Sequence, residues 1–128
     1  MIAFIIAAAI AQPAPAASAP AERPPYRVHG IGGSSCASWT EARQQRDGTA
    51  DAARISWLGG FVSAHNALLG VLQSRSDLLG GSNLDEAAGW VDAYCRRNPR
   101  EELHYAAQEL VSELLSRQRR PAGQGAPR

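Results

Sequence analysis

Lysine is absent from the sequence. All 13 basic residues are arginines, and 12 acidic residues leave a formal net charge of +1. A charge balance this close to zero gives no long-range field that steers a protein toward nucleic acid or an acidic membrane, so we expect neither as a partner. The all-arginine set either serves bidentate recognition of phosphate or carboxylate groups, or it follows the same base composition that makes the chain rich in alanine, glycine and proline.

Cysteine is scarce, with Cys36 and Cys95 as the two examples in the chain. Neither has a second cysteine three residues away, which excludes the C-x-x-C units of zinc sites and thioredoxin-like redox motifs. The pair is a disulfide, two separate buried thiols or half of a metal site, and in an exported protein the disulfide is the default. It would close a loop of about 60 residues, for which the chain-entropy estimate of stabilisation is roughly 4 kcal/mol.

Charge is missing from residues 1–21. Within them, Ile2–Ala11 is an apolar run of ten residues, which is too short to span a bilayer and typical of the hydrophobic region of a signal peptide. No arginine or lysine precedes the run, so residues 1–21 are an atypical signal peptide or an apolar leader. We expect a bacterial protein that is periplasmic or secreted, with no stable membrane span after signal cleavage.

The remainder of the chain divides by composition. We assign residues 22–34 to a flexible linker, 35–118 to a helical domain and 119–128 to a disordered basic tail. The glycine-rich stretch His29–Ser35 in the linker lacks the Lys-Ser/Thr pair of a phosphate-binding P-loop. The helical domain is a single small unit, too small for a Rossmann fold or a TIM barrel.

Strand-like alternation of apolar and polar residues is also absent. Apolar residues instead recur at intervals of three and four, as on one face of a helix. We predict four helices, at about residues 36–46, 50–72, 83–97 and 99–117. They would form an all-α, small orthogonal or irregular bundle, in which a Cys36–Cys95 disulfide ties the first helix to the end of the third.

Two capping patterns mark predicted helix starts. Asn83 is followed three residues later by Glu86, the spacing of a capping box. Asn98 precedes Pro99, and Glu101 then stands at the third helical position, so we place the start of the last helix at Pro99.

The second predicted helix carries the candidate interaction surface. Ser56, Gly60 and Ala64 form a row of small residues at intervals of four, which lets another helix approach closely. The row packs either within the domain or across a homodimer. The loop that follows contains Leu78-Leu79, which we expect to be exposed. The predicted interaction residues are Trp57, Gly60, Phe61, Ala64, Leu78 and Leu79.

Side chains suited to catalysis or metal binding are few. Glu101 and His104 have the E-x-x-H spacing of di-iron carboxylate bundles, but such a site needs a second copy and two further carboxylates, and neither His29 nor His65 supplies the second copy. His65 lies on an apolar stripe, where we interpret it as a core or boundary histidine. We therefore predict no catalytic residue, no metal and no cofactor, and a protein that is not an enzyme.

Three short motifs frame the helical domain. Cys36 is followed closely by Trp39, a central helix carries Trp57–Phe61 (WLGGF), and Cys95 precedes a proline-started amphipathic helix. Over about residues 35–116 this framework resembles the small periplasmic acid-stress chaperones of the HdeA type. The resemblance implies a helical fold held by one disulfide. It also implies a function in which dimers separate at low pH and expose apolar surface to unfolding client proteins.

Two longer stretches, Trp57–Leu68 and Tyr94–Leu114, resemble instead the Tai-type immunity proteins of bacterial secretion systems. That resemblance implies a small exported helical protein that neutralises a toxin by binding it. The cysteine framework favours the first resemblance. We therefore expect a protein that contacts unfolded clients, with toxin binding as the alternative and a small metalloprotein or enzyme as the least favoured class.

Overall fold

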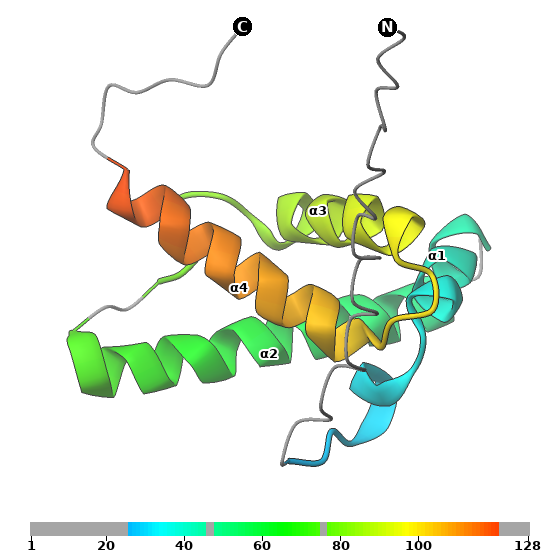
Figure 1. The fold of residues 1–128 in the computed structure, drawn as a ribbon, viewed down its shortest axis with the longest axis horizontal. Helices are drawn as coiled ribbons and strands as arrows, with labels where there is room; N and C mark the ends of the chain where they lie inside the picture. The colour runs from blue at the N-terminus through cyan, green and yellow to red at the C-terminus, as the bar shows by residue number, and fades with distance from the viewer. Residues whose placement is uncertain (1–25, 46–47, 75–76, 121–128) are drawn as a thin grey trace, which may run out of the picture.

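The computed structural model describes residues 26–45, 48–74 and 77–120, which form four α-helices and one 3-10 turn (Figure 1). The elements are η1 (Gly30–Gly33), α1 (Cys36–Gln44), α2 (Gly48–Gln73), α3 (Leu84–Arg97) and α4 (Leu103–Arg119). No strand occurs among the described residues, and the predicted all-α class is confirmed. The predicted leader (1–21), the first part of the linker and nearly all of the basic tail lie outside the described residues.

Two helix starts have side-chain caps, and the one at Asn83 was predicted from the sequence. The Ser35 side chain accepts a hydrogen bond from the backbone N–H of Ser38 at the start of α1. The Asn83 side chain accepts one from the N–H of Glu86 at the start of α3, and the Glu86 carboxylate accepts one from the Asn83 amide in return. A helix leaves its first N–H groups without intrahelical acceptors, so these side chains stabilise both starts.

The start of α4 differs from the prediction. The helix begins at Leu103 and not at Pro99, because the carbonyls of Pro99 and Glu101 accept hydrogen bonds from the first N–H groups of α1, those of Ala37 and Cys36. The N–H of Leu103 returns a bond to the Ser34 carbonyl. The segment between α3 and α4 therefore caps another helix.

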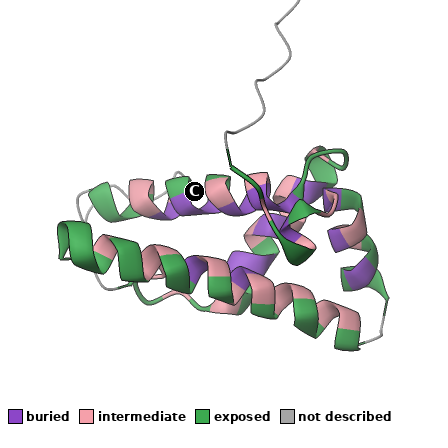
Figure 2. Ribbon diagram, turned by 90° about the horizontal axis from the view of Figure 1, so that it is seen from below, coloured by how far each residue is buried: buried purple, intermediate pink, exposed green. Residues whose placement is uncertain are grey.

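The core lies between the four helices and draws most heavily on α4. The buried residues of α4 include Leu103, Ala106, Ala107, Leu110, Val111 and Leu114. They meet Trp39 of α1, Leu58 and Val62 of α2, and Val91 of α3. Since α2 contributes two buried residues from a helix of 26, most of its circumference lies outside the core, and Figure 2 shows this helix mainly in green and pink, the colours of exposed and intermediate residues.

The part of the predicted linker that the structure describes, residues 26–34, contacts the helical domain. Gly32 is buried against the ring of Trp57 on α2, and a Cβ at this position would overlap that ring. The Gln108 amide of α4 donates a hydrogen bond to the hydroxyl of Tyr26. The glycine at position 32 is needed for close approach between η1 and α2 rather than for flexibility.

Candidate functional site

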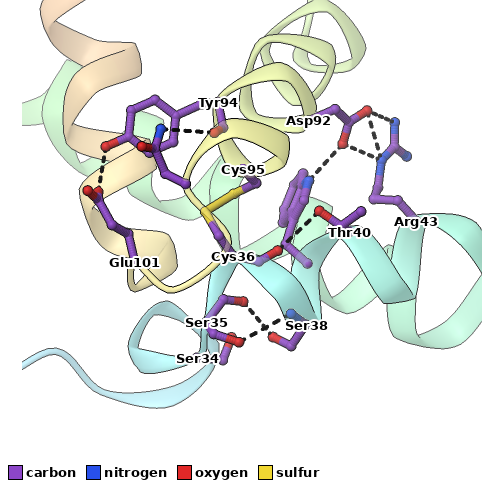
Figure 3. The surroundings of a disulfide bond; sticks show 12 residues. Ser34, Ser35, Cys36, Ser38, Thr40, Arg43, Asp92, Tyr94, Cys95 and Glu101 are labelled. Atoms are coloured by element: carbon purple, nitrogen blue, oxygen red, sulfur yellow. Dashed lines mark hydrogen bonds and ion pairs between the residues drawn. A yellow bond between two sulfur atoms is a disulfide. The ribbon is translucent and has the colours of Figure 1, made fainter.

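Cys36 and Cys95 form a disulfide, as predicted, with an S–S distance of 2.05 Å (Figure 3). Both residues are fully buried, and no other cysteine is present in the chain. The bond joins the first residue of α1 to the last turn of α3. Neither position therefore carries a free thiol.

A charged cluster on the same side of the molecule joins three helices. The Trp39 indole donates a hydrogen bond of 2.7 Å to the Asp92 carboxylate. Arg43 donates to the same carboxylate through Nε and Nη2, each at 3.0 Å, and to Asp51 through Nη1 at 3.2 Å. Hydrogen bonds to Asp92 raise the pKa of Arg43. Figure 3 shows Arg43 of α1 beside Asp92 of α3. Arg43 also holds the carboxylate of Asp51 on α2, and no spacing in the sequence marks this cluster.

Tyr94 and Glu101 make a second polar contact close to the disulfide. The Tyr94 hydroxyl donates to the Glu101 carboxylate at 2.6 Å. Burial, and after it the hydrogen bond to Glu101, raise the pKa of Tyr94 to about 12. Glu101, predicted as a capping residue of the last helix, instead attaches the α3–α4 segment to α3.

The predicted helical spacing of inward apolar residues is seen near the middle of α2. Leu58 and Val62 are buried. Beside them Trp57, Phe61 and His65 are half-buried and follow one another along the helix, with ring centroids 5.4 Å and 4.6 Å apart. Two of the predicted interaction residues, Trp57 and Phe61, therefore contribute mainly to packing against the core.

The outward side of α2 is uncovered. Ser56, Gly60 and Ala64 are all exposed, and no atom lies within 4 Å of the place where a Cβ on Gly60 would stand. Within the described chain the row of small residues therefore packs against no helix. The predicted interaction residues Gly60 and Ala64 lie on this open side.

Large apolar side chains gather at the C-terminal end of the same helix. Leu68, Val71 and Leu72, which we call the α2 tip, are 55%, 85% and 67% exposed. No charged residue occurs between Arg54 and Arg75 in the sequence. By length and hydropathy α2 is the one helix among the described residues that could cross a membrane. Leu58 and Val62 belong to the core, so spanning would require their removal from it.

The loop before α3 corrects one predicted interaction residue. Leu78 is 2% exposed and belongs to the core, and Leu79 is half-buried against it. The Asn66 side chain of α2 accepts a hydrogen bond from the Leu78 N–H, and the Gln118 side chain of α4 donates one to the Leu78 carbonyl. These side chains fix the loop from both sides and turn Leu78 inward. Polar neighbours in the sequence had suggested exposure.

His104 carries the one buried imidazole among the described residues. It is 2% exposed, and its Nδ1 lies 3.3 Å from a carboxylate oxygen of Glu102. Glu101, the other member of the E-x-x-H motif, is bonded to Tyr94 instead. No group of three or more metal-ligating side chains occurs in the part of the chain that the structure describes.

Comparison with known proteins found no match to any family model, curated protein or solved structure.

Proposed function

We propose that this is an exported, non-catalytic helical protein that acts by contact with other proteins, in the manner of the HdeA-type acid-stress chaperones of the periplasm. The uncovered side of α2 is the observation that carries the proposal. Its three tip residues are exposed by more than half, in a stretch of sequence without charge. Grouped apolar side chains on a protein surface mark a site of interaction more often than scattered ones do.

Export is supported by the buried Cys36–Cys95 disulfide. Disulfides persist in the periplasm and outside the cell, and they are rare in the reducing cytoplasm. The uncharged leader (residues 1–21) is consistent with the same compartment. We place the protein in the periplasm or outside a bacterial cell.

The response to acid is supported by the charge inventory and by the cluster around Arg43. Protonation of all 12 carboxylates leaves 13 arginines and three histidines charged, and repulsion on that scale loosens a compact protein. Arg43 makes ion pairs with Asp92 of α3 and Asp51 of α2, and an ion pair stabilises a fold only while both of its groups are charged. The disulfide would keep α1 and α3 joined while α2 moves away from them, so acid would uncover further apolar surface without complete unfolding.

The test is suppression of client aggregation at about pH 2 to 3 and at about pH 7. The full chain should keep an acid-denatured client soluble at low pH, and Leu68→Glu and Leu72→Glu should weaken this effect. Ser63→Glu is the matched control, because it adds the same charge to another exposed position of α2. Aggregation that proceeds equally with and without the protein at both values of pH would contradict the chaperone role.

Toxin immunity is the second candidate function. Its supporting observation is that the α2 tip is already exposed in the folded protein, as binding of one folded partner at neutral pH requires. A secreted effector encoded beside this gene should then form a stable complex with the purified protein. Leu72→Glu should weaken the complex at neutral pH, and absence of any complex with that effector would contradict immunity.

A further inference from the structure

A recess with an apolar floor and a charged rim opens between α3, α4 and the loop that precedes α3. Its volume is about 240 Å³. A second recess of about 220 Å³ adjoins it, since both are lined by Leu79, Ser82, Leu114 and Arg117. An apolar cavity of about 150 Å³ holds a benzene-sized guest, so the first recess has room for one bulky apolar group of a small ligand.

The floor of the recess belongs to the core. Ala87, Leu110 and Leu114 are buried, and they line the recess together with the half-buried side chains of Leu79 and Trp90. A ligand that enters the recess therefore places apolar surface against aliphatic side chains and an indole, out of contact with water.

Two opposite charges stand at the rim. Glu86 of α3 and Arg117 of α4 both line the recess, and both are exposed. The ion pairs of the described residues include none between these two, because Nε of Arg117 bonds to Glu113 at 2.8 Å. Oε1 of Glu86 accepts from the Asn83 amide. The second oxygen of Glu86 and both Nη groups of Arg117 have no partner within the described chain.

We propose that this recess binds a small zwitterion with one apolar side chain, which is the chemistry of a free amino acid such as leucine or phenylalanine. The ligand's carboxylate accepts hydrogen bonds from the Nη groups of Arg117, and its ammonium group donates to the Glu86 carboxylate. Its side chain lies against the apolar floor. Bonds between charged groups are stronger than neutral ones, and the planar guanidinium matches the geometry of a carboxylate.

The pair of rim charges selects among ligands. An internal segment of polypeptide has neither an ammonium nor a carboxylate group in its backbone. A fatty acid has the carboxylate alone, and an aliphatic amine has the ammonium alone. Each of these leaves Glu86, Arg117 or both without a charged partner, so a ligand that carries both signs is favoured over all three.

The walls of the recess are held in place before a ligand arrives. The Gln118 side chain of α4 donates a hydrogen bond to the carbonyl of Asp77, and the Asp77 carboxylate accepts one from the N–H of Leu79. On α3, the indole of Trp90 stacks on the ring of Tyr94, with the centroids 5.6 Å apart. Little ordering of the protein is then needed on binding, which lets a ligand of few atoms bind measurably.

Nuclear magnetic resonance titration of the oxidised full chain with L-leucine and L-phenylalanine tests the proposal. The backbone N–H signals of Leu79 and Ser82 and the indole signal of Trp90 should shift and saturate, with a Kd of about 1 mM or below. 4-Methylpentanoate is leucine without its amino group, and isoamylamine is leucine without its carboxylate. Each should bind about tenfold more weakly than leucine, because one rim charge is left unmatched.

Charge-removing variants assign each rim group to its partner on the ligand. Arg117→Gln should weaken leucine binding about tenfold without weakening that of isoamylamine, which has no carboxylate for Arg117 to bind. Glu86→Gln should weaken leucine binding without weakening that of 4-methylpentanoate, and glutamine at this position keeps the helix cap. Asp85→Asn is the matched control, because it removes an exposed charge beside Glu86 from outside the recess. Helical circular dichroism confirms that each variant is folded.

Several results would overturn the proposal. Absence of a saturable shift with either amino acid up to about 50 mM would exclude the site. Equal affinity for leucine and its two single-charge analogues would show that the rim charges take no part. N-Acetylleucinamide, which stands for an uncharged polypeptide segment, should bind more weakly than leucine, and equal or tighter binding would make the recess a polypeptide site. Equal weakening of leucine and isoamylamine binding by Arg117→Gln would show that Arg117 does not contact the carboxylate.

This site is separate from the surface that carries the proposed function, since none of its lining residues belongs to α2. Leu72→Glu should therefore bind leucine as the natural protein does, whether or not it protects client proteins. Loss of leucine binding in Leu72→Glu would place the ligand on α2 and contradict the assignment to the recess. Client protection and leucine binding can each fail alone, so the two proposals are tested separately.

Discussion

The indole nitrogen of Trp39 and the carboxylate of Asp92 meet at 2.7 Å, although 53 residues separate them along the chain. The indole is otherwise part of the core, and Trp39 is completely buried. Asp92 thus accepts from a core side chain on one side and from Arg43 at the surface on the other. Asp92 of α3 therefore contacts α1 both in the core, through Trp39, and at the surface, through Arg43. Arg43 in turn pairs with Asp51 of α2.

Asp92→Asn should destabilise the protein by about 1 kcal/mol. The amide oxygen can still accept from Trp39, but the charge-assisted bonds from Arg43 are lost, and such bonds contribute about 1.5 to 3 kcal/mol before allowance for the partial exposure of this pair. Urea denaturation at neutral pH measures the change. Asp51→Asn is the control and should cost less than about 0.5 kcal/mol, because Arg43 keeps its bonds to Asp92. Equal losses for the two variants would contradict this assignment.

Removal of the disulfide should cost roughly 4 kcal/mol. The double variant Cys36→Ala, Cys95→Ala frees a loop with a sequence separation of 59 residues, and the unfolded chain gains the corresponding entropy. Thermal denaturation followed by circular dichroism should show a large fall in Tm. The natural chain should resist reductant under native conditions, since both cysteines are fully buried. Rapid reduction of the folded protein would show that the bond is accessible.

Glycine-to-alanine changes at two positions should have opposite signs. Gly32→Ala should destabilise the protein, because the added methyl group would overlap the Trp57 ring and approach the Val28 side chain to 2.8 Å. Gly60→Ala should stabilise it by about 0.4 to 1 kcal/mol, since it removes backbone freedom from a mid-helix position where nothing lies within 4 Å. Denaturant midpoints measured on dilute protein compare the two. A loss of stability at Gly60 would reveal a contact on that side of α2.

Two leucines only six residues apart should respond very differently to truncation. Leu78→Ala should cost about 2 to 5 kcal/mol, because it leaves a cavity in the core. Leu72→Ala should change the stability of the monomer by less than about 0.5 kcal/mol, because Leu72 is exposed. Chemical denaturation at low concentration distinguishes the two, and a small effect at Leu78 would mean that the loop lies outside the core.

Tyr94 should ionise with a pKa of about 12 in the folded protein, against an ordinary value of 10.0. Since the folded state holds this proton more tightly than the unfolded state, its contribution to stability is complete below about pH 10 and is lost as the pH rises toward about 12. The difference between phenolate absorbance titrations of the natural chain and Tyr94→Phe isolates the group. A midpoint near the ordinary value would show that the bond to Glu101 is absent in solution.

Interactions between residues close together in the sequence were predictable, whereas interactions between distant segments were not. The Asn83 cap was predictable because donor and acceptor are three residues apart. Pro99 was a sound local signal for a helix start, but the carbonyls of this segment bond to the first turn of α1. That partner lies more than 60 residues away in the chain, and no local pattern reveals it.

The residues of the candidate interaction surface also divide into those placed by local spacing and those placed by distant contacts. The spacing of apolar residues predicted a helix with one inward side, where Leu58 and Val62 lie, but it left open whether the row of small residues on α2 packs within the domain or across a homodimer. Leu78 was misplaced, because its burial depends on hydrogen bonds from Asn66 and Gln118 on two different helices.

The attachment of η1 to Trp57 has a practical consequence for anyone who labels or immobilises this protein. Fourteen to fifteen residues separate Trp57 from Val71 and Leu72, which places the entry of the chain into the fold roughly 20 Å along the helix from the tip. A dye or solid support attached at Tyr26 therefore leaves the exposed leucines of the α2 tip accessible.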